Sequence, residues 1–333
     1  MQRRRSWRRQ NVVRMGSDGR DPQAPWDMFA RMIEAKKAEV KRLVEEHSSD
    51  MDPLMMRLQY VRSPVNIKIS ESLRPPRNDS DFCHKLTMIA DLKRESPTHP
   101  DPSQRRVLSY SDASEMACAL TNMGFDAIFV NTDQSFWGGS YDDIRKIKEE
   151  FRVRGVRFSE RPAIIAKDLM LHPLQMAYAV EMGADGVVLN SLLLGQDMEH
   201  MMEAAIVMGC ETVVEVHTQQ EADDAVKQGA NIIMVNQWDR VDGRLSPLQA
   251  GKLRDRIHPE VITIVAGGIQ DYKQISDIGM LGYDSVVLGR KLADEDVPQL
   301  VDRVRAWEGP PRLTLTMGMG RAIRDEVQQD MYY

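Results

Sequence analysis

Side chains that could carry proton-transfer chemistry stand at the ends of several apolar segments of this sequence. Lysines and carboxylates that meet in one place shift each other's pKa, and together they can hold an anionic substrate and move protons on it. A rim of solvated salt bridges is the alternative, but several polar segment ends together favour a site. The candidate residues are Asp91, Lys93, Lys167, Glu215 and Asn236.

Glycines at two further segment ends form a second candidate group. Gly267 and Gly268 end one apolar run, and Gly289 ends the next, with Arg290 directly after it. Backbone amides at glycines can approach a phosphoryl group closely, and the N-terminus of a following helix adds partial positive charge. The pattern predicts a phosphate-binding site, and an ordinary turn is the alternative because glycine is the default turn residue.

Eight short apolar runs alternate with amphipathic stretches of helix length from residue 87 onward. Continuous apolar character indicates strands that are buried on both faces, as in a parallel sheet covered by helices. Eight strand–helix units in about 220 residues have the length and rhythm of a closed (β/α)8 barrel. The runs are residues 87–93, 126–131, 162–168, 185–190, 211–217, 231–236, 261–268 and 284–289.

This barrel also explains the positions of the candidate residues, because the reactive groups of such barrels lie at the C-terminal ends of strands. Side chains alternate between the two faces of a strand, so Asp91 shares a face with Lys93, and Glu215 shares one with His217. We interpret His217 as orienting the carboxylate, with proton transfer as the alternative. An open doubly wound sheet is the alternative fold, but it needs a glycine-rich turn after the first strand, which residues 93–97 lack.

The segments outside the barrel divide the rest of the chain. Residues 26–47 have apolar side chains near helical spacing with charges between them, and this predicts an amphipathic helix. Residues 62–82 contain three prolines and are predicted to form a loop. The predicted organisation is a basic tail at 1–25, a helical extension and loop at 26–84, the barrel at 85–308 and a tail at 309–333.

The two tails indicate where the protein resides and what it contacts. The first 17 residues hold six arginines and no acidic residue, which is typical either of a transit-peptide remnant or of a disordered basic tail. The first interpretation predicts a soluble protein of the plastid stroma and the second a cytoplasmic one. The chain ends in Met331, Tyr332 and Tyr333, so the terminal segments are either surface tails or docking segments for a protein partner.

Composition argues against several classes of function. A net charge of −6 argues against a general nucleic-acid binder. The chain has no apolar run near the roughly 18–20 residues that cross a bilayer, so we predict no membrane span. Its three cysteines lack metal-site spacing and indicate a reducing compartment. With no nucleotide motif either, we predict neither a metal nor a cofactor.

Five ordered motifs of this sequence resemble those of the indole-3-glycerol phosphate synthase family. The first, Asp-Leu-Lys-Arg-Glu-Ser-Pro, is similar to the Glu-x-Lys-x-x-Ser-Pro motif of that family. The resemblance extends over residues 85–306, and the helix predicted at 26–47 resembles the N-terminal extension of the family. The motifs lie at residues 91–97, 136–140, 167–168, 214–217 and 235–236.

The resemblance implies an activity on a phosphosugar and a role for each candidate residue. Members of the family close the indole ring of 1-(2-carboxyphenylamino)-1-deoxyribulose 5-phosphate and release carbon dioxide and water. Lys167 is then the general acid at the substrate carbonyl, and Glu215 acts in proton transfer during dehydration. Lys93 contacts the substrate carboxylate or serves as the acid of the second step, and Asn236 orients the hydroxyl of the intermediate. The phosphate site is implied to be lined by Ser96, Gly268 and Gly289.

Three positions depart from the pattern of the family. The glutamate of the first strand is Asp91 here, whose side chain is shorter by about 1.5 Å. The Glu-Ser-Gly of the seventh strand is Ala266-Gly267-Gly268, and the arginine of the sixth-strand motif is Trp238, with Arg240 two residues further on. The resemblance thus implies a carboxy-lyase of this family. The alternative is a barrel that has lost catalysis and serves as an assembly or regulatory subunit.

Overall fold

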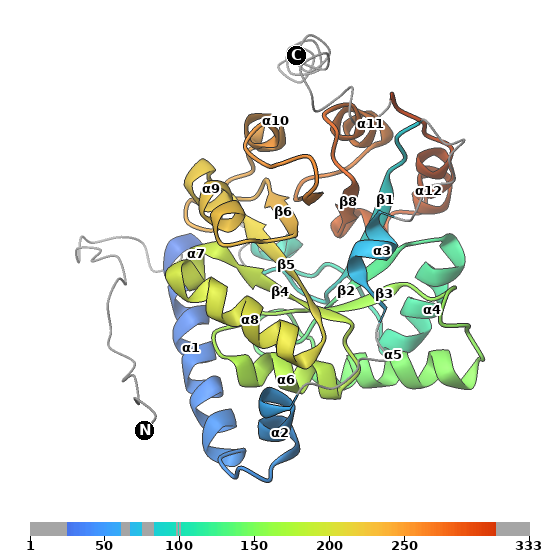
Figure 1. Ribbon diagram of the computed structural model, residues 1–333. Coiled ribbons are helices and arrows are strands. Elements are labelled where there is room, and N and C mark those ends of the chain that lie inside the picture. Colours follow the sequence, from blue (N-terminus) through green and yellow to red (C-terminus); the bar gives the residue numbers. More distant parts are fainter. Residues whose placement is uncertain (1–24, 61–66, 75–82, 98, 100, 311–333) are drawn as a thin grey trace.

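A computed structural model describes residues 25–60, 67–74, 83–97, 99 and 101–310 of the chain. Eight parallel strands form a closed barrel in sequence order (Figure 1). This confirms the predicted (β/α)8 barrel, and each predicted run is shortened by one or two residues at its ends. The strands are β1 (Thr87–Leu92), β2 (Ala127–Asn131), β3 (Ala163–Lys167), β4 (Gly186–Asn190), β5 (Glu211–Val216), β6 (Ile232–Asn236), β7 (Ile262–Ala266) and β8 (Ser285–Leu288).

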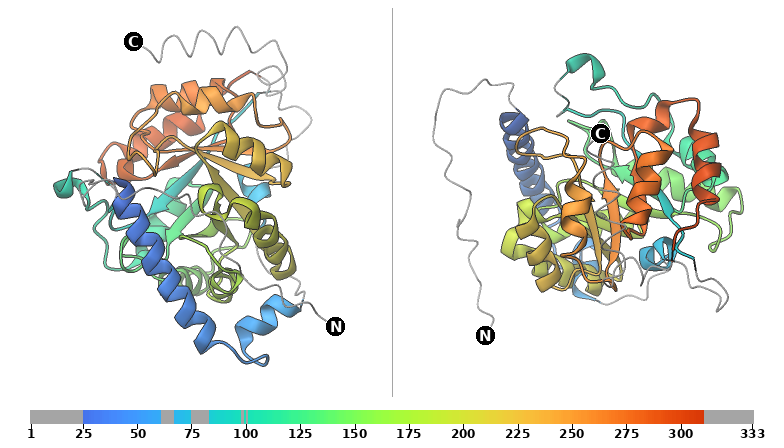
Figure 2. Two further views of the ribbon diagram at one scale, coloured as in Figure 1. Left: turned by 90° about the vertical axis from the view of Figure 1, so that its left-hand side faces the viewer. Right: turned by 90° about the horizontal axis from the view of Figure 1, so that it is seen from above.

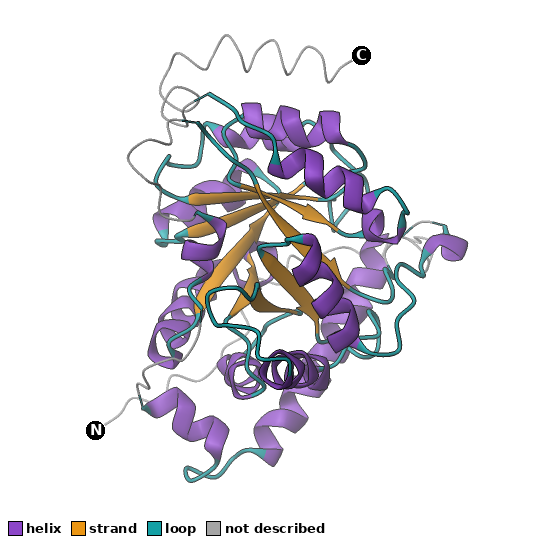
Figure 3. Cartoon of the chain, turned by 90° about the vertical axis from the view of Figure 1, so that its right-hand side faces the viewer, coloured by secondary structure: helices purple, strands orange, loops and turns teal. Residues whose placement is uncertain are grey.

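Helices follow the strands and cover the outside of the barrel (Figure 3). Several begin at a polar residue whose side chain accepts a hydrogen bond from a backbone amide of the first turn, such as Asp112, Ser140 and Thr218. The helices are α4 (Ala113–Met123), α5 (Tyr141–Val153), α6 (Pro173–Glu181), α7 (Ser191–Leu194), α8 (Met198–Met208), α9 (Gln219–Lys227), α10 (Gln249–Arg254), α11 (Tyr272–Met280) and α12 (Val297–Arg305).

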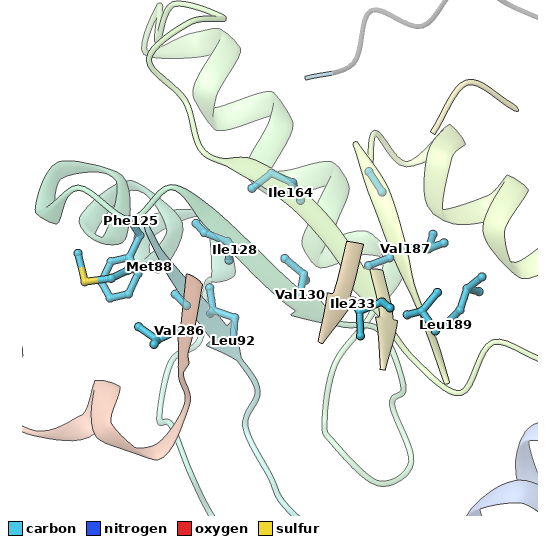
Figure 4. Packing of buried hydrophobic residues seen from close by; sticks show 14 of the residues in the cluster. Met88, Leu92, Phe125, Ile128, Val130, Ile164, Val187, Leu189, Ile233 and Val286 are labelled. Carbon is cyan, nitrogen blue, oxygen red and sulfur yellow. The ribbon is translucent and has the colours of Figure 1, made fainter. Parts of the chain in front are cut away.

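Alternation along the strands separates two apolar layers. The outward side chains, among them Met88, Ile128 and Val187, pack against the helices (Figure 4). The inward side chains form a separate cluster that fills the centre of the barrel. Its strand residues are Ile89, Ala127, Phe129, Ala163, Ile165, Val188, Val213, Ile232, Met234, Ile262, Ile264, Ala266 and Val287. The two-residue period therefore assigns each strand residue to one layer.

The N-terminal extension contacts both ends of the barrel. Helix α1 (Pro25–Glu46) lies diagonally across its side (Figure 2), and α2 (Pro53–Gln59) packs against α6 and α8. A short helix, α3 (Ile69–Leu73), adds Ile69 and Leu73 to the inward cluster at the N-terminal ends of the strands. The hydroxyl of Thr87, the first residue of β1, donates to the carbonyl of Leu73 over 3.1 Å.

Helix α3 corrects the prediction of a loop over residues 62–82. Five residues are too few for a helix that is stable by itself, so α3 depends on its contacts with the strand ends. Ser70 donates from its amide and its hydroxyl to Glu211 over 2.9 and 2.6 Å. Ile69 and Leu73 stand four residues apart and so lie on one face of the helix, which is the face that closes the barrel.

The predicted tails at 1–25 and 309–333 lie almost wholly outside the described residues, so their assignments stay predictions. Within the described part of the chain, no helix is both long enough and apolar enough to span a bilayer.

Candidate active site

A ring of polar side chains lies directly above the inward apolar layer. The next inward position after that layer is polar on six strands, and the first five of them carry Asp91, Asn131, Lys167, Asn190 and Glu215. The same two-residue step that buries apolar side chains lower in the barrel therefore turns these groups toward its axis. On β6 the equivalent position is Asn236, whereas β7 has the apolar Ala266 and β8 is followed by Gly289.

Asp91 joins two lysines at one oxygen. Its Oδ2 lies 2.5 Å from Nζ of Lys93 and 3.1 Å from Nζ of Lys167. Its Oδ1 accepts a hydrogen bond of 2.9 Å from the side-chain amide of Asn131. The ammonium groups of positions 93 and 167, which come from different strands, are therefore close together, as the sequence predicted.

Burial and the neighbouring charges together set the pKa values of this group. Burial alone would raise the pKa of Asp91, but Lys167 and Lys93 outweigh it and hold the carboxylate ionised. The pKa of Lys167 is lowered from its ordinary value of 10.5, first by burial and further by the positive charge of Lys93, while Asp91 opposes the shift. Lys167 is thus a cation that gives up its proton more readily than a lysine in water.

Glu215 forms a second charged group on the other side of the mouth. Its carboxylate receives two hydrogen bonds from the guanidinium of Arg240, of 2.5 and 2.8 Å, and one each from the amides of Asn190 (3.0 Å) and Asn236 (3.2 Å). Burial alone would raise the pKa of Glu215, but Arg240 and then Lys167 lower it to about 2. Glu215 is therefore ionised and fixed in orientation.

Arg240 reaches the mouth because the chain after β6 folds back on itself. The amide of Asp239 donates to the carbonyl of Arg244, and the amide of Ser246 donates to the carbonyl of Gln237. Trp238 and Leu245 form a β-bridge between the two arms of this turn. The guanidinium of Arg240 thus reaches Glu215 from a position two residues after Trp238.

The two charged groups face a cavity of about 360 Å³. All ten residues that the sequence singled out line it: Asp91, Lys93, Ser96, Lys167, Glu215, Asn236, Gly267, Gly268, Gly289 and Arg290. The cavity is large enough for a small phosphorylated ligand. A β-carbon at Gly289 would lie 3.6 Å from both Asp91 Oδ2 and Lys93 Nζ, so this glycine adjoins the lysine group.

The glycine side of the cavity differs from the charged side. Gly267 has a φ of +92°, and a β-carbon there would lie 2.9 Å from Oδ1 of Asn236. The side chain of Leu245 covers Gly268 so closely that a β-carbon would meet it at 2.6 Å. Arg290 donates to the carbonyl of Gln104 over 2.6 Å, which joins the segments after β8 and β1 at the edge of the cavity.

Sequence reasoning missed two residues of this site and noted a third, Arg240, only for its position two residues after Trp238. Asn131 and Asn190 close the second and fourth apolar runs, and the alternation of strand residues would have found them. Arg240 lies within the turn after β6, and nothing local indicates that it folds back to Glu215. His217 directly follows the last residue of β5, Val216, and its ring lies within hydrogen-bonding distance (2.6 Å) of the carbonyl of Asn236. Its role in orienting Glu215 stays a prediction.

Metal ligands do not gather at this mouth. Among the described residues, no three histidine, cysteine, aspartate or glutamate side chains are placed to hold a metal ion.

Comparisons with known proteins agree with this geometry. The family model described as indole-3-glycerol phosphate synthase matches residues 29–304. The indole-3-glycerol phosphate synthase of Chlorobium chlorochromatii is 28% identical over 264 residues, which make up 79% of this chain and 93% of that protein. That of Mycolicibacterium smegmatis is 27% identical over 282 residues, or 84% and 94% of the two chains.

A solved structure with a similar fold is the 3-hexulose-6-phosphate synthase of Salmonella typhimurium. It has a TM-score of 0.50 and 16% sequence identity, and the match covers 66% of this chain and 97% of that one. At this identity the likeness concerns the barrel alone. The match of the family model over most of the chain is what decides its relationship: this chain belongs to the indole-3-glycerol phosphate synthase family.

Proposed function

We propose that this protein closes the indole ring of 1-(2-carboxyphenylamino)-1-deoxyribulose 5-phosphate. A bond forms between the ring carbon that bears the carboxylate and the ketone carbon of the sugar, carbon dioxide leaves, and water is then eliminated. The observation that supports this most is the pair of lysine ammonium groups at Asp91, opposite an ionised Glu215 and across one cavity. Family membership gives the same indication.

Lys167 is suited to the first step, in which the ketone oxygen must gain a proton. A general acid works best when its pKa is near the operating pH, and burial lowers the pKa of Lys167 toward that range. Lys93, 19% exposed at the side chain and bonded to the same carboxylate, is suited to the carboxylate of the substrate or to the second proton donation. Asp91 positions both ammonium groups and balances the positive charge that grows during ring closure.

Glu215 is suited to accept the proton lost when water is eliminated. Arg240 and then Lys167 lower its pKa, so it is in the ionised form that a proton acceptor needs. Arg240 and the amides of Asn190 and Asn236 fix its position, and Asn236 also faces the cavity, where it can orient a hydroxyl of the intermediate. Arg240 would take over the contact with the substrate carboxylate that Trp238 cannot make.

The phosphate of the substrate would lie at the glycine side of the cavity. Ser96, Gly267, Gly268 and Gly289 offer backbone amides or a hydroxyl there, and Arg290 brings a positive charge to the same edge. In many barrels of this kind, the phosphate site is formed by the loops after the seventh and eighth strands.

The test is to incubate the purified protein with the substrate and to follow the fluorescence of the indole product. Turnover that is lost in Lys167→Met supports the proposal. No turnover, together with no binding of a reduced substrate analogue, would end it. A matched control is Lys37→Met, which removes a lysine that is half-exposed on α1 and remote from the cavity lining.

A second candidate function is that of a non-catalytic assembly or regulatory subunit. It is favoured by Ala266, which brings no carboxylate to the mouth where the family has one. Stable co-purification with a larger complex, in the absence of turnover, would support it. The plastid location stays a prediction that the relatives do not support, because the two synthases named above come from bacteria.

A further inference from the structure

A buried lysine of the N-terminal extension lies behind the candidate site. Lys36 belongs to the stripe of α1 that faces the barrel, together with Phe29 and Met32, and its side chain is 1% exposed. Its ammonium lies 2.7 Å from Oδ2 of Asp133 and 2.9 Å from Oδ1 of Asp168. We call these three residues the latch. They join α1 to the segments that directly follow β2 and β3.

Within the latch, the positive charge of Lys36 compensates the negative charges of two buried carboxylates. Asp133 and Asp168 are both buried, and two carboxylates that share a site repel each other unless a cation lies between them. Each also orders the backbone beside it, because Asp133 accepts from the amide of Phe136 over 2.7 Å and Asp168 from the amide of Leu169 over 2.7 Å. Loss of the cation would therefore disturb both segments.

These segments carry groups of the active site. Asp168 is the neighbour of Lys167, and Asp133 stands two residues after Asn131, which holds Asp91. Trp137 and Leu169 line the cavity, and behind it they pack in one apolar cluster with Phe29 and Met32 of α1. The wall of the cavity and the backbone that carries the proposed acid thus depend on where α1 lies.

We propose that Lys36 is a positioning residue, which fixes Lys167 and the Trp137–Leu169 wall of the cavity by holding α1 against β2 and β3. Lys36 itself lies outside the cavity lining and acts through Asp133 and Asp168. The proposal rests on the proposed function for its kinetic consequence only. Its geometric consequence, the environment of Lys167, is independent of any turnover.

The test compares three full-length variants. Lys36→Met removes the cation. Lys36→Met/Asp133→Asn/Asp168→Asn also removes the two buried carboxylates and keeps their shape, and it leaves only Glu39, a third partner of Lys36 that is 40% exposed, so it should fold even if the single variant does not. Lys37→Met is the matched control, because this neighbouring lysine is 48% exposed and pairs with Glu34 on the surface. Each variant is first checked for cooperative unfolding.

Two readouts, kcat and the rate of Lys167 acylation, distinguish positioning from a merely structural role. In the latch variants we expect kcat to fall by about tenfold or more, because a small misplacement of a catalytic group is costly. We also expect Lys167 to be acylated faster by an amine-reactive reagent, followed by mass spectrometry, and α1 to exchange its amide hydrogens faster. Lys37→Met should change none of these.

The outcomes separate the two proposals. A folded latch variant with the kcat and the Lys167 acylation rate of Lys37→Met would overturn the role of Lys36, even if its melting temperature were lower. If the unmodified protein shows no turnover, the proposed function fails, and the acylation and exchange rates still decide whether Lys36 positions Lys167. Unchanged rates in that case would also overturn it.

Discussion

Buried carboxylates lie at both ends of the barrel, but their surroundings differ. At the N-terminal end, Asp185 accepts hydrogen bonds from the amide of Ile164 and from both terminal nitrogens of Arg161. Asp284 is bound in the same way by the amide of Thr263 and by Arg74. At the C-terminal end, Asp91 and Glu215 are bonded mainly by side chains, and a cavity of about 360 Å³ lies between them.

The difference shows that the bonding partners of a buried carboxylate determine whether it serves stability or activity. Backbone amides hold the carboxylates of the lower end in a fixed position, and Ile69 and Leu73 fill the space between the strands there. The upper carboxylates are bonded to the side chains of Lys93, Lys167 and Arg240, and the space beside them is free for a ligand. We therefore expect the lower end to determine stability and the upper end to determine activity.

The largest expected effect is that of Lys167→Met at the upper end. Removing the proposed general acid should lower kcat by about 10²–10⁴-fold, whereas Asp91 keeps Lys93 as a partner, so the free energy of unfolding should change by no more than about 1 kcal/mol. Steady-state kinetics and urea denaturation measure the two quantities. A large loss of stability with little loss of kcat would contradict the division between the two ends.

The reverse result is expected for Asp185→Asn at the lower end. This substitution keeps the shape of the side chain but leaves Arg161 and Lys148 without their buried counter-ion, and breaking such a pair costs about 3–5 kcal/mol. Urea denaturation should show this loss, while kcat of the folded protein should stay unchanged. A variant of normal stability and low kcat would show instead that the lower end takes part in catalysis.

A smaller effect is expected on the pH dependence of kcat/KM. The proposed acid works only while Lys167 is protonated, and its pKa is lowered from 10.5 by burial and by Lys93. Activity should therefore be lost as the pH rises through a value below 10.5. Lys93→Met removes a neighbouring positive charge, so it should move this alkaline limb to higher pH. A limb that stays in place would assign the titration to another group.

The smallest effect concerns two glycines of the upper end. Gly289 has a negative φ of −112° and room for a methyl group, so Gly289→Ala should cost less stability than the same substitution at Gly267. It should also raise KM a few-fold, because the methyl group would adjoin Lys93. Gly267 has a φ of +92°, so Gly267→Ala should lower the free energy of unfolding by about 1–3 kcal/mol. Equal losses of stability at both positions would contradict this order.

The sequence predicted the barrel because eight apolar runs are a global pattern that no single contact can override. It also predicted the lining of the mouth, because strand ends and alternation are local properties. Residues fixed by tertiary contacts could not be found in this way. Arg240 enters through the turn after β6, α3 forms only against the strand ends, and Lys36 interrupts an apolar stripe that pattern reasoning takes as complete.

The short helix α3 also bears on how the chain is made. Ile69 and Leu73 leave the ribosome before any strand of the barrel, yet the shell that surrounds them is complete only when β8 has joined β1. Arg74, directly after α3, can pair with Asp284 only after a further 210 residues have been synthesised. A segment synthesised before every strand of the barrel is thus among the last to find its place, and a nascent chain that stalls before β8 would display these side chains to chaperones.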